Sequence, residues 1–149
     1  MPQFAGFRFE FYHGGTAITR VKVQAVDTDG APFLLRALVD VWLSSDGDGF
    51  GVPADCLGSA PGQAARMTAN EMLRPCHGVT FVSVPEAAIF RLQTRADGCV
   101  GIAFSMREFP LYVAAQCGAM TAPSVSRALT PADFGPIPDH EVKLQVTKR

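Results

Sequence analysis

Residues 88–106, AIFRLQTRADGCVGIAFSM, decide how the fold of this chain is interpreted. Two runs of alternating apolar and polar residues flank Ala96-Asp97-Gly98, and a short glycine-containing loop between two such runs predicts a β-hairpin. A three-residue loop pairs Phe90 with Phe104 and sets the bulky apolar side chains of both runs on one face. A slip of one residue would mix the two faces, so the alternation favours this register. Gly98 then takes the left-handed conformation, which a side chain disfavours.

The N-terminal residues 7–25 repeat this pattern around the possible loop His13-Gly14-Gly15. Closing that loop predicts the cross-strand pairs Phe11–Ala17, Phe9–Thr19 and Phe7–Val21. The next segment, residues 33–43, fits either a strand or an amphipathic helix. We favour a strand, because a meander then pairs Val23 with Leu35 and Val21 with Ala37.

The remaining chain adds a helix and several short elements. The patterns predict a helix at 63–73, a strand at 79–84, a short helix at 111–117, a capped turn at 130–133 and a strand at 142–146. This order predicts an α+β fold with a mostly antiparallel, strongly curved or barrel-like sheet and one or two short helices. We expect a single domain over residues 1–149.

Composition limits the classes of function. The 149 residues carry a net charge of −1, so no global field favours nucleic acid or an anionic membrane surface. No apolar run is long enough for a transmembrane helix, and the N-terminal residues do not have the pattern of a signal peptide. Four cysteines without close spacing indicate reduced thiols, and we expect a cytoplasmic protein.

No motif predicts catalysis, a cofactor or a metal. Residues 44–55 match a calcium loop at several positions but lack its usual first aspartate and final glutamate. Cys76-His77 could join Cys56 in a zinc site only if the remaining ligands were chosen freely. A small enzyme that depends on cysteine and histidine is therefore the least favoured class.

One charge pattern stands out on the non-core side of the first strands. In the predicted registers Arg8 lies opposite Arg20, and Lys22 lies opposite Arg36. Like charges directly across a ladder are unfavourable, so an unpaired cluster suggests a function. Apolar side chains among basic ones are typical of binding surfaces. The predicted binding residues are Arg8, Arg20, Lys22, Arg36, Leu38 and Trp42.

Two plainer interpretations of this surface stay open. The basic side chains can simply be solvated, with their stems lying over neighbouring residues. The helix predicted at 63–73 can also cover Leu34, Leu38 and Trp42 as a second core layer.

These residues favour a non-enzymatic binding protein that engages an acidic partner protein or an anionic ligand. Its size and the lack of a catalytic motif are shared with small bacterial immunity and accessory proteins, which is a similarity of class and identifies no family. The alternative is a barrel-like pocket for a small apolar ligand. Its lining would be Phe7, Phe9, Phe11, Phe33, Phe90 and Phe104.

Overall fold

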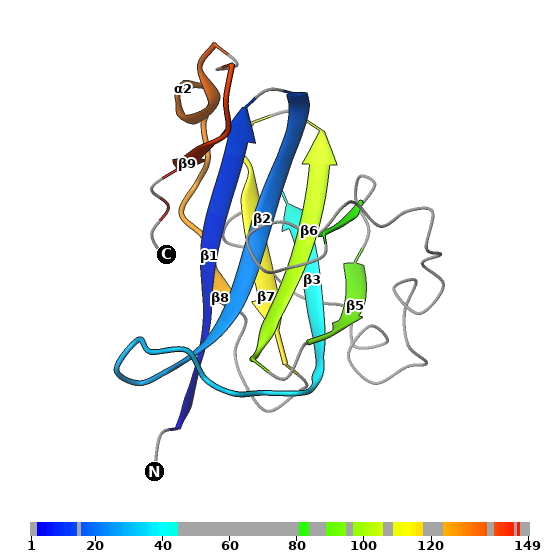
Figure 1. Ribbon diagram of the computed structural model, residues 1–149, viewed down its shortest axis with the longest axis vertical. Coiled ribbons are helices and arrows are strands. Elements are labelled where there is room, and N and C mark those ends of the chain that lie inside the picture. Colours follow the sequence, from blue (N-terminus) through cyan, green and yellow to red (C-terminus); the bar gives the residue numbers. More distant parts are fainter. Residues whose placement is uncertain are drawn as a thin grey trace.

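The computed structural model describes residues 3–14, 16–44, 81–83, 89–94, 97–105, 109–117, 124–136, 139–144 and 146. Within these ranges the chain forms nine strands and one short helix (Figure 1). In chain order these are β1 (Phe4–Gly14), β2 (Thr16–Asp27), β3 (Leu38–Ser44), β4 (Phe81–Ser83), β5 (Ile89–Gln93), β6 (Cys99–Ser105), β7 (Tyr112–Gln116), β8 (Ser124–Val125), α2 (Pro131–Phe134) and β9 (Val142–Leu144). The helix predicted at 63–73 lies outside the described residues, as do Cys56, Cys76-His77 and nearly all of the calcium-like loop.

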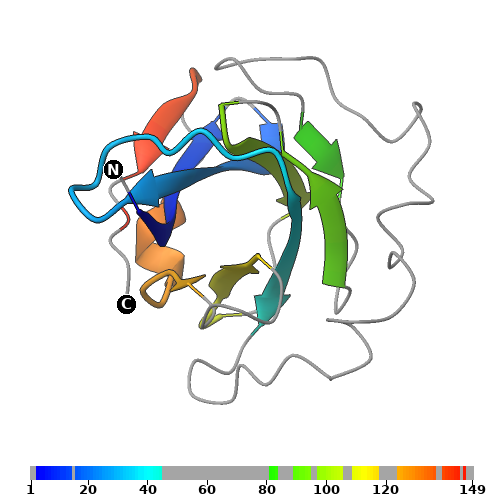
Figure 2. The ribbon, with the colours of Figure 1, turned by 90° about the horizontal axis from the view of Figure 1, so that it is seen from below.

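The strands form two sheets that face each other across a shared core (Figure 2). The first sheet has the strand order β4-β6-β2-β1-β9, and the second has the order β5-β3-β7-β8. Every ladder in the described residues is antiparallel except the short parallel pair of β4 and β6. The prediction of a mostly antiparallel, β-rich fold is confirmed, and the helix of the described part is a single turn. Among the described strands neither sheet closes on itself.

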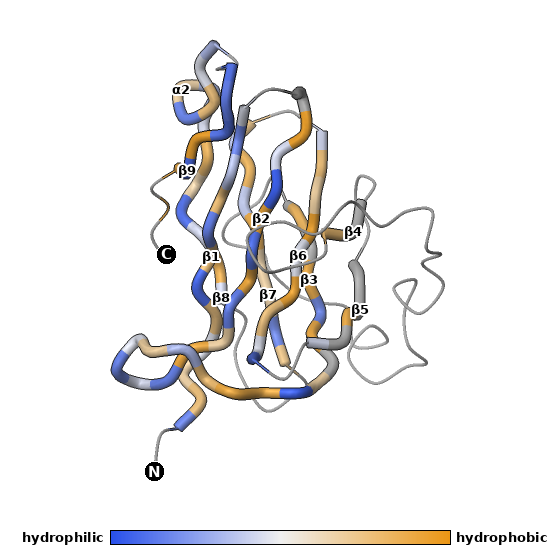
Figure 3. The backbone as a smooth tube through the Cα atoms, viewed as in Figure 1, coloured by the Kyte–Doolittle hydropathy of each residue, from blue (hydrophilic) through white to orange (hydrophobic). Residues whose placement is uncertain are grey.

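The core is built from side chains that alternate along the strands, and Figure 3 shows the matching alternation of hydropathy along β2. Successive side chains of a strand point to opposite faces of its sheet, so every second residue enters the core. The inward orientation predicted for the apolar residues is confirmed at Phe7, Phe9, Phe11, Val21, Val100, Ile102 and Phe104. The second sheet contributes Val39, Val41, Leu43, Leu92, Val113 and Ala115.

The hairpin of β1 and β2 forms, but its predicted register is wrong. Phe11 lies opposite Val21, four residues along β2 from its predicted partner Ala17. An even shift keeps each side chain on its own face, so hydrophobic alternation cannot distinguish the two registers. The ladder continues to Gly14 opposite Thr16, so residues assigned to the loop belong to the strands.

The hairpin predicted over residues 88–106 does not form, although both of its strands do. β5 pairs with β3 in the second sheet, whereas β6 pairs with β2 in the first. The connection between them is held from two sides: the Thr94 N–H donates to the Ala37 carbonyl, and the Ala25 N–H donates to the Gly98 carbonyl, both at 2.9 Å. Gly98 has φ +82°, which confirms its predicted left-handed conformation.

Two other segments correct the sequence interpretation. Residues 33–37 form a connection and β3 begins at Leu38, so the predicted meander of β2 with residues 33–43 is wrong. Residues 112–116, predicted as a helix, form β7 between β3 and β8. Pairing with β3 therefore overrides the local helix signal after Pro110. The predicted capped turn and closing strand are confirmed as α2 and β9.

The first sheet approaches the second along the early part of β1. β9 pairs with β1 only from Phe11 to His13, so the earlier part of β1 has no partner strand on this side among the described residues. Here the N–H of Phe7 donates to Oγ of Ser124 on β8, at 3.0 Å. This side-chain hydrogen bond thus links β1 of the first sheet to β8, an edge strand of the second.

Candidate functional site

The outer side of β9, β1 and β2 carries cationic side chains from three adjacent strands. We call it the cationic face, and it consists of Arg8, Arg20, Lys22 and Lys143. Cross-strand pairing sets Tyr12 opposite both Lys143 and Arg20, while Lys22 lies opposite Glu10. The face is therefore a mixed array in which the cations lie beside acidic residues.

Glu10 is the centre of this array. Its carboxylate accepts a hydrogen bond from the Tyr12 hydroxyl (2.9 Å) and lies 3.4 Å from Lys143 Nζ and 3.7 Å from Arg8 Nε. Burial by itself raises the pKa of this carboxyl, but the Tyr12 hydroxyl and the ammonium groups of Lys143 and Lys22 outweigh burial and hold the pKa below its ordinary value. Glu10 is thus ionised at neutral pH.

The cations of the face differ in how firmly they are held. Arg20 pairs with Glu141 at 3.2 Å, and both side chains are largely buried. Arg8 donates a hydrogen bond from Nη1 to the carbonyl of Gly30 at 3.2 Å, but its side chain is 44% exposed. The side chain of Lys143 is 51% exposed. Arg8 and Lys143 are accordingly the cations most accessible to a partner.

The like-charge pairs predicted from the sequence are wrong. Arg8 lies opposite Gln24, and Lys22 lies opposite Glu10, because β2 is shifted by four residues. Arg36 lies in the connection before β3 and pairs with neither strand of the face. The predicted cluster of unpaired cations is therefore replaced by one in which Glu10 and Glu141 take part.

The six predicted binding residues do not come together on one sheet. Arg8, Arg20 and Lys22 share the outer side of the first sheet, whereas Leu38 and Trp42 belong to β3 of the second. Toward β6 the outer side of the first sheet becomes apolar and buried at Phe81, Cys99 and Ala103, with Ile18 packed against them. The cationic face thus ends at β2.

A second polar feature lies at the other end of β1, where the sequence pattern predicts a loop. The side chain of His13 is only 2% exposed, and its Nδ1 is hydrogen-bonded to Oγ1 of Thr19 at 3.0 Å. Its Nε2 is also buried, and the backbone of Phe134 lies within hydrogen-bonding reach of the ring. His13 continues the inward alternation of Phe7, Phe9 and Phe11, which is the signal that could have placed it in the core.

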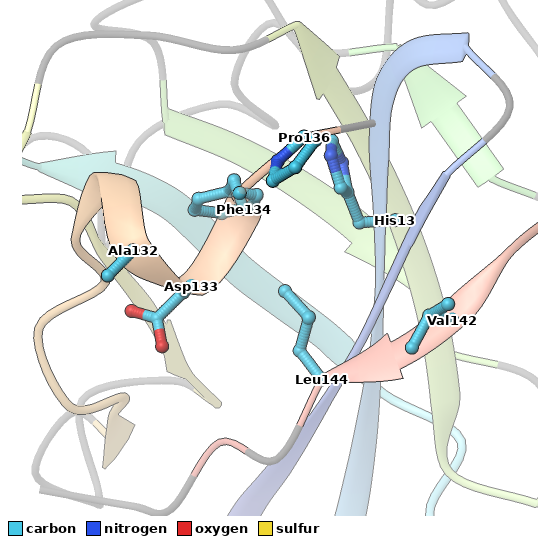
Figure 4. Close-up of a pocket in the computed structure, with 8 residues that line it drawn as sticks. His13, Ala132, Asp133, Phe134, Pro136, Val142 and Leu144 are labelled. Atoms are coloured by element: carbon cyan, nitrogen blue, oxygen red, sulfur yellow. The ribbon is translucent and has the colours of Figure 1, made fainter. Parts of the chain in front are cut away.

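His13 lines a pocket of about 200 Å³ between β1, α2 and β9. Figure 4 shows its imidazole beside the rings of Phe134 and Pro136, with Leu144 pointing toward them from β9. The rings of His13 and Phe134 pack edge to face, with their centroids 5.1 Å apart. Gly14 lets the backbone just before β9 approach β1 closely, because a Cβ there would overlap the carbonyl oxygen of His140.

Asp133 lies at the rim of the pocket but is already engaged. Its two carboxylate oxygens accept hydrogen bonds from Arg127 at 2.8 and 3.0 Å, and one also accepts the N–H of Thr130 at 2.7 Å. The hydrogen bond from Arg127 is the main reason that the pKa of Asp133 lies below its ordinary value. Asp133 therefore anchors α2 and is not placed to serve His13 as a base.

Neither thiol of the described residues has the surroundings of a nucleophile. Burial raises the pKa of Cys117, and the carboxylate of Asp40 adds to this effect. Cys99 is buried and donates to Oε1 of Gln24. No group of three potential metal ligands occurs in the described ranges. Five of the six phenylalanines predicted to line an apolar pocket belong to the core or pack against it, namely Phe7, Phe9, Phe11, Phe104 and Phe33. A ligand pocket among these side chains stays a prediction.

Comparison with known proteins finds no family, no curated sequence and no solved structure that matches this chain. Within the ranges that the structure describes, no helix has the length and apolar character needed to cross a membrane. Any functional assignment therefore depends on the chemistry of the two sites above.

Proposed function

We propose that this chain is a non-enzymatic binding protein whose cationic face engages an acidic partner protein or an anionic ligand. The observation that carries the proposal is the convergence of Arg8, Arg20, Lys22 and Lys143 from three adjacent strands onto one side of the first sheet. The carboxylates of Glu10 and Glu141 leave these cations in excess on a chain whose net charge is −1.

The geometry of the ion pairs supports exchange with a partner. Arg8 and Lys143 approach Glu10 at 3.7 and 3.4 Å and are about half exposed. Ion pairs whose cation is exposed in this way contribute roughly 0–1 kcal/mol to stability, so a partner carboxylate can join Arg8 and Lys143 at little cost while Glu10 stays in place. Arg20 is held by Glu141 and keeps the face in place. Complementary charge of this kind mainly favours encounter rate and specificity.

We infer an immunity-type or accessory role in the cytoplasm for this binding protein. The protonated thiol of Cys117 and the buried thiol of Cys99 are compatible with a reducing compartment. We also infer a curved, barrel-like arrangement of the two sheets, supported by the hydrogen bond between Phe7 and Ser124 that links their edges.

Poly-L-glutamate of defined length, used as an acidic probe, tests the proposal. Binding of the folded protein, followed by fluorescence anisotropy, should weaken as salt is raised, because exposed charges are screened. Arg8→Glu and Lys143→Glu should each weaken binding severalfold. Arg36→Glu is the matched control, because it changes the net charge equally at an exposed arginine outside the face.

The comparison with the control decides the outcome. Retained binding by Arg36→Glu together with loss by Arg8→Glu supports the cationic face as the binding surface. An equal loss in all three variants would show that only net charge matters, and an absence of binding at low salt would remove the proposal.

A further inference from the structure

The register of β1 indicates which backbone groups of β9 face outward. The N–H of Phe7 points away from β2, because it donates to Ser124. The ladder of β1 with β2 is regular from Phe7 to His13. The N–H and C=O groups of alternate residues point to the same edge of a strand. Phe11 and His13 therefore direct these groups toward β9.

The same alternation turns the backbone of the middle residue of β9 outward. Val142 and Leu144 lie opposite His13 and Phe11, so their N–H and C=O groups face β1. Those of Lys143 face the other edge, where no strand of the described part of the chain pairs with β9. This edge thus offers one donor and one acceptor to a further strand.

The two faces of β9 differ in chemistry. Lys143 lies on the outer side, within the cationic face, and its side chain is 51% exposed. Val142 and Leu144 lie on the inner side, where they line the pocket beside α2 together with Phe134 and Pro136 (Figure 4). Val142 is one of the two large hydrophobic residues that are exposed in the described ranges. A strand added beside β9 would therefore meet a cation on one side and apolar surface on the other.

We propose that an extended segment of an acidic partner protein pairs antiparallel with the free edge of β9 and adds a strand to the first sheet. This inference rests on the proposed function and specifies how the partner is held. Side chains alternate along a strand, so the segment that fits carries acidic residues at every second position and apolar residues between them. An acidic side chain then lies opposite Lys143, and its apolar neighbours lie against Val142 and Leu144.

Charge favours such a segment over a second copy of this chain. In a symmetric pair of β9 strands centred on Lys143, the two ammonium groups would lie directly opposite each other, which is unfavourable. A pair shifted toward Glu141 would set Lys143 opposite a carboxylate that Arg20 already holds at 3.2 Å. An acidic segment of a partner meets neither obstacle.

Four synthetic peptides with blocked ends test the pairing of strands. The first alternates glutamate and valine over about seven residues, a typical strand length. The second has the same residues in two blocks. The third and fourth are the first peptide with backbone N-methyl groups on its glutamates or on its valines, which removes those N–H donors.

In the proposed antiparallel pairing, the glutamates direct their N–H groups toward β9 and the valines direct theirs to solvent. The block peptide and the peptide methylated on glutamate should therefore bind about tenfold more weakly than the first, whereas methylation on valine should change little. The proposal is overturned if the block peptide or the peptide methylated on glutamate binds as tightly as the alternating peptide.

Two variants and hydrogen exchange locate the added strand on the protein. Lys143→Ala removes the cation and keeps the N–H, whereas Lys143→Pro removes both, and proline is tolerated on an edge strand where its nitrogen faces solvent. The proline variant should bind the alternating peptide about tenfold more weakly than the alanine variant. In the wild type the peptide should slow exchange of the Lys143 amide. Equal binding by the two folded variants, or unchanged exchange at Lys143, would remove the proposal.

These results are distinguishable from failure of the proposed function. If poly-L-glutamate binding requires Arg8 and Lys143 but the order of residues in the peptides has no effect, the cationic face stands and strand pairing is removed. Protection of the Lys143 amide in concentrated protein without peptide would assign the edge to a second copy and also remove it. Failure of every acidic probe to bind would remove both.

Discussion

At the scale of single residues, Gly98 lies where the chain passes from β5 in one sheet to β6 in the other. Its φ of +82° lies in the left-handed region, and a Cβ there would be 2.4 Å from the carbonyl oxygen of Phe33 and 3.0 Å from Cβ of Ala25. Gly30 has nearly the same φ, +83°, but a Cβ there would meet nothing within 4 Å. Both glycines therefore share the left-handed conformation, but only at Gly98 would a side chain also overlap neighbouring atoms. Comparing substitutions at the two positions distinguishes these two costs.

Gly30→Ala should lower the free energy of unfolding by roughly 1–2 kcal/mol, the cost of a left-handed conformation for a residue with a side chain. Gly98→Ala should lower the free energy of unfolding further than Gly30→Ala does, because the carbonyl of Phe33 must also move. Urea unfolding of both variants and the wild type measures the difference. Equal losses would show that the contact with Phe33 is relieved without cost.

His13 makes stability depend on pH. Its pKa is lowered in the folded protein, so the unfolded chain binds the proton first as the pH falls below about 6.5. Stability is therefore lost between this pH and the lower folded pKa, by at most about 1.4 kcal/mol per pH unit. Glu10 and Asp133, whose pKa values are also lowered from 4.5 and 3.8, act at more acidic pH.

We expect His13→Gln to flatten the plot of unfolding free energy against pH in the window just below 6.5. His140→Gln serves as the matched control, because it removes an exposed histidine. Urea midpoints from pH 5 to 7 provide the measurement. An unchanged slope in His13→Gln would mean that another group causes the pH dependence.

At the scale of elements, alternation indicates which face of a strand is buried but not which strand lies beside it. Phe7, Phe9 and Phe11 point inward as predicted, yet their partners on β2 are four residues away from the predicted ones. A shift by an even number leaves both faces intact, whereas a shift by one would not. The side-chain directions could therefore be predicted from the sequence, and the cross-strand neighbours could not.

The candidate sites were only partly predictable for the same reason, because alternation does not show which residues lie opposite each other on neighbouring strands. Arg8, Arg20 and Lys22 were correctly expected on the outer side, but the placement of Glu10 beside Arg8 and Lys22 emerged only once the register was known. His13 was assigned to a loop because glycines follow it, although its position continues the pattern of Phe7 and Phe11. Lys143 reaches the face through the pairing of β9 with β1, a contact between distant parts of the chain that local patterns do not reveal.

At the scale of the whole molecule, β5 and β6 show why a strong local hairpin signal was misleading. Both strands bury one face in the common core, which is what a hairpin would also require. β6 instead lies between β2 and β4, and β5 lies beside β3. Sequential strands that pack in opposite sheets satisfy the same hydrophobic pattern, so the choice depends on long-range backbone pairing.

The joining of the two sheets leads to a further prediction. The N–H of Phe7 and the side chain of Ser124 are both buried, and their 3.0 Å bond connects β1 to β8. Ser124→Ala leaves this N–H without its acceptor, which should cost about 1–3 kcal/mol, because a buried unsatisfied donor loses its hydration without compensation. Ser105→Ala, at an exposed position on β6, should change stability by less than about 0.5 kcal/mol.

Hydrogen exchange distinguishes a loss at this bond from general destabilisation. In Ser124→Ala the amide of Phe7 should exchange faster than the decrease in global stability explains, while amides that pair β1 with β2 should change only with global stability. Uniform acceleration along β1 would indicate that the bond has no separate role. Unchanged protection at Phe7 together with wild-type stability would show that the apolar core alone holds the two sheets together.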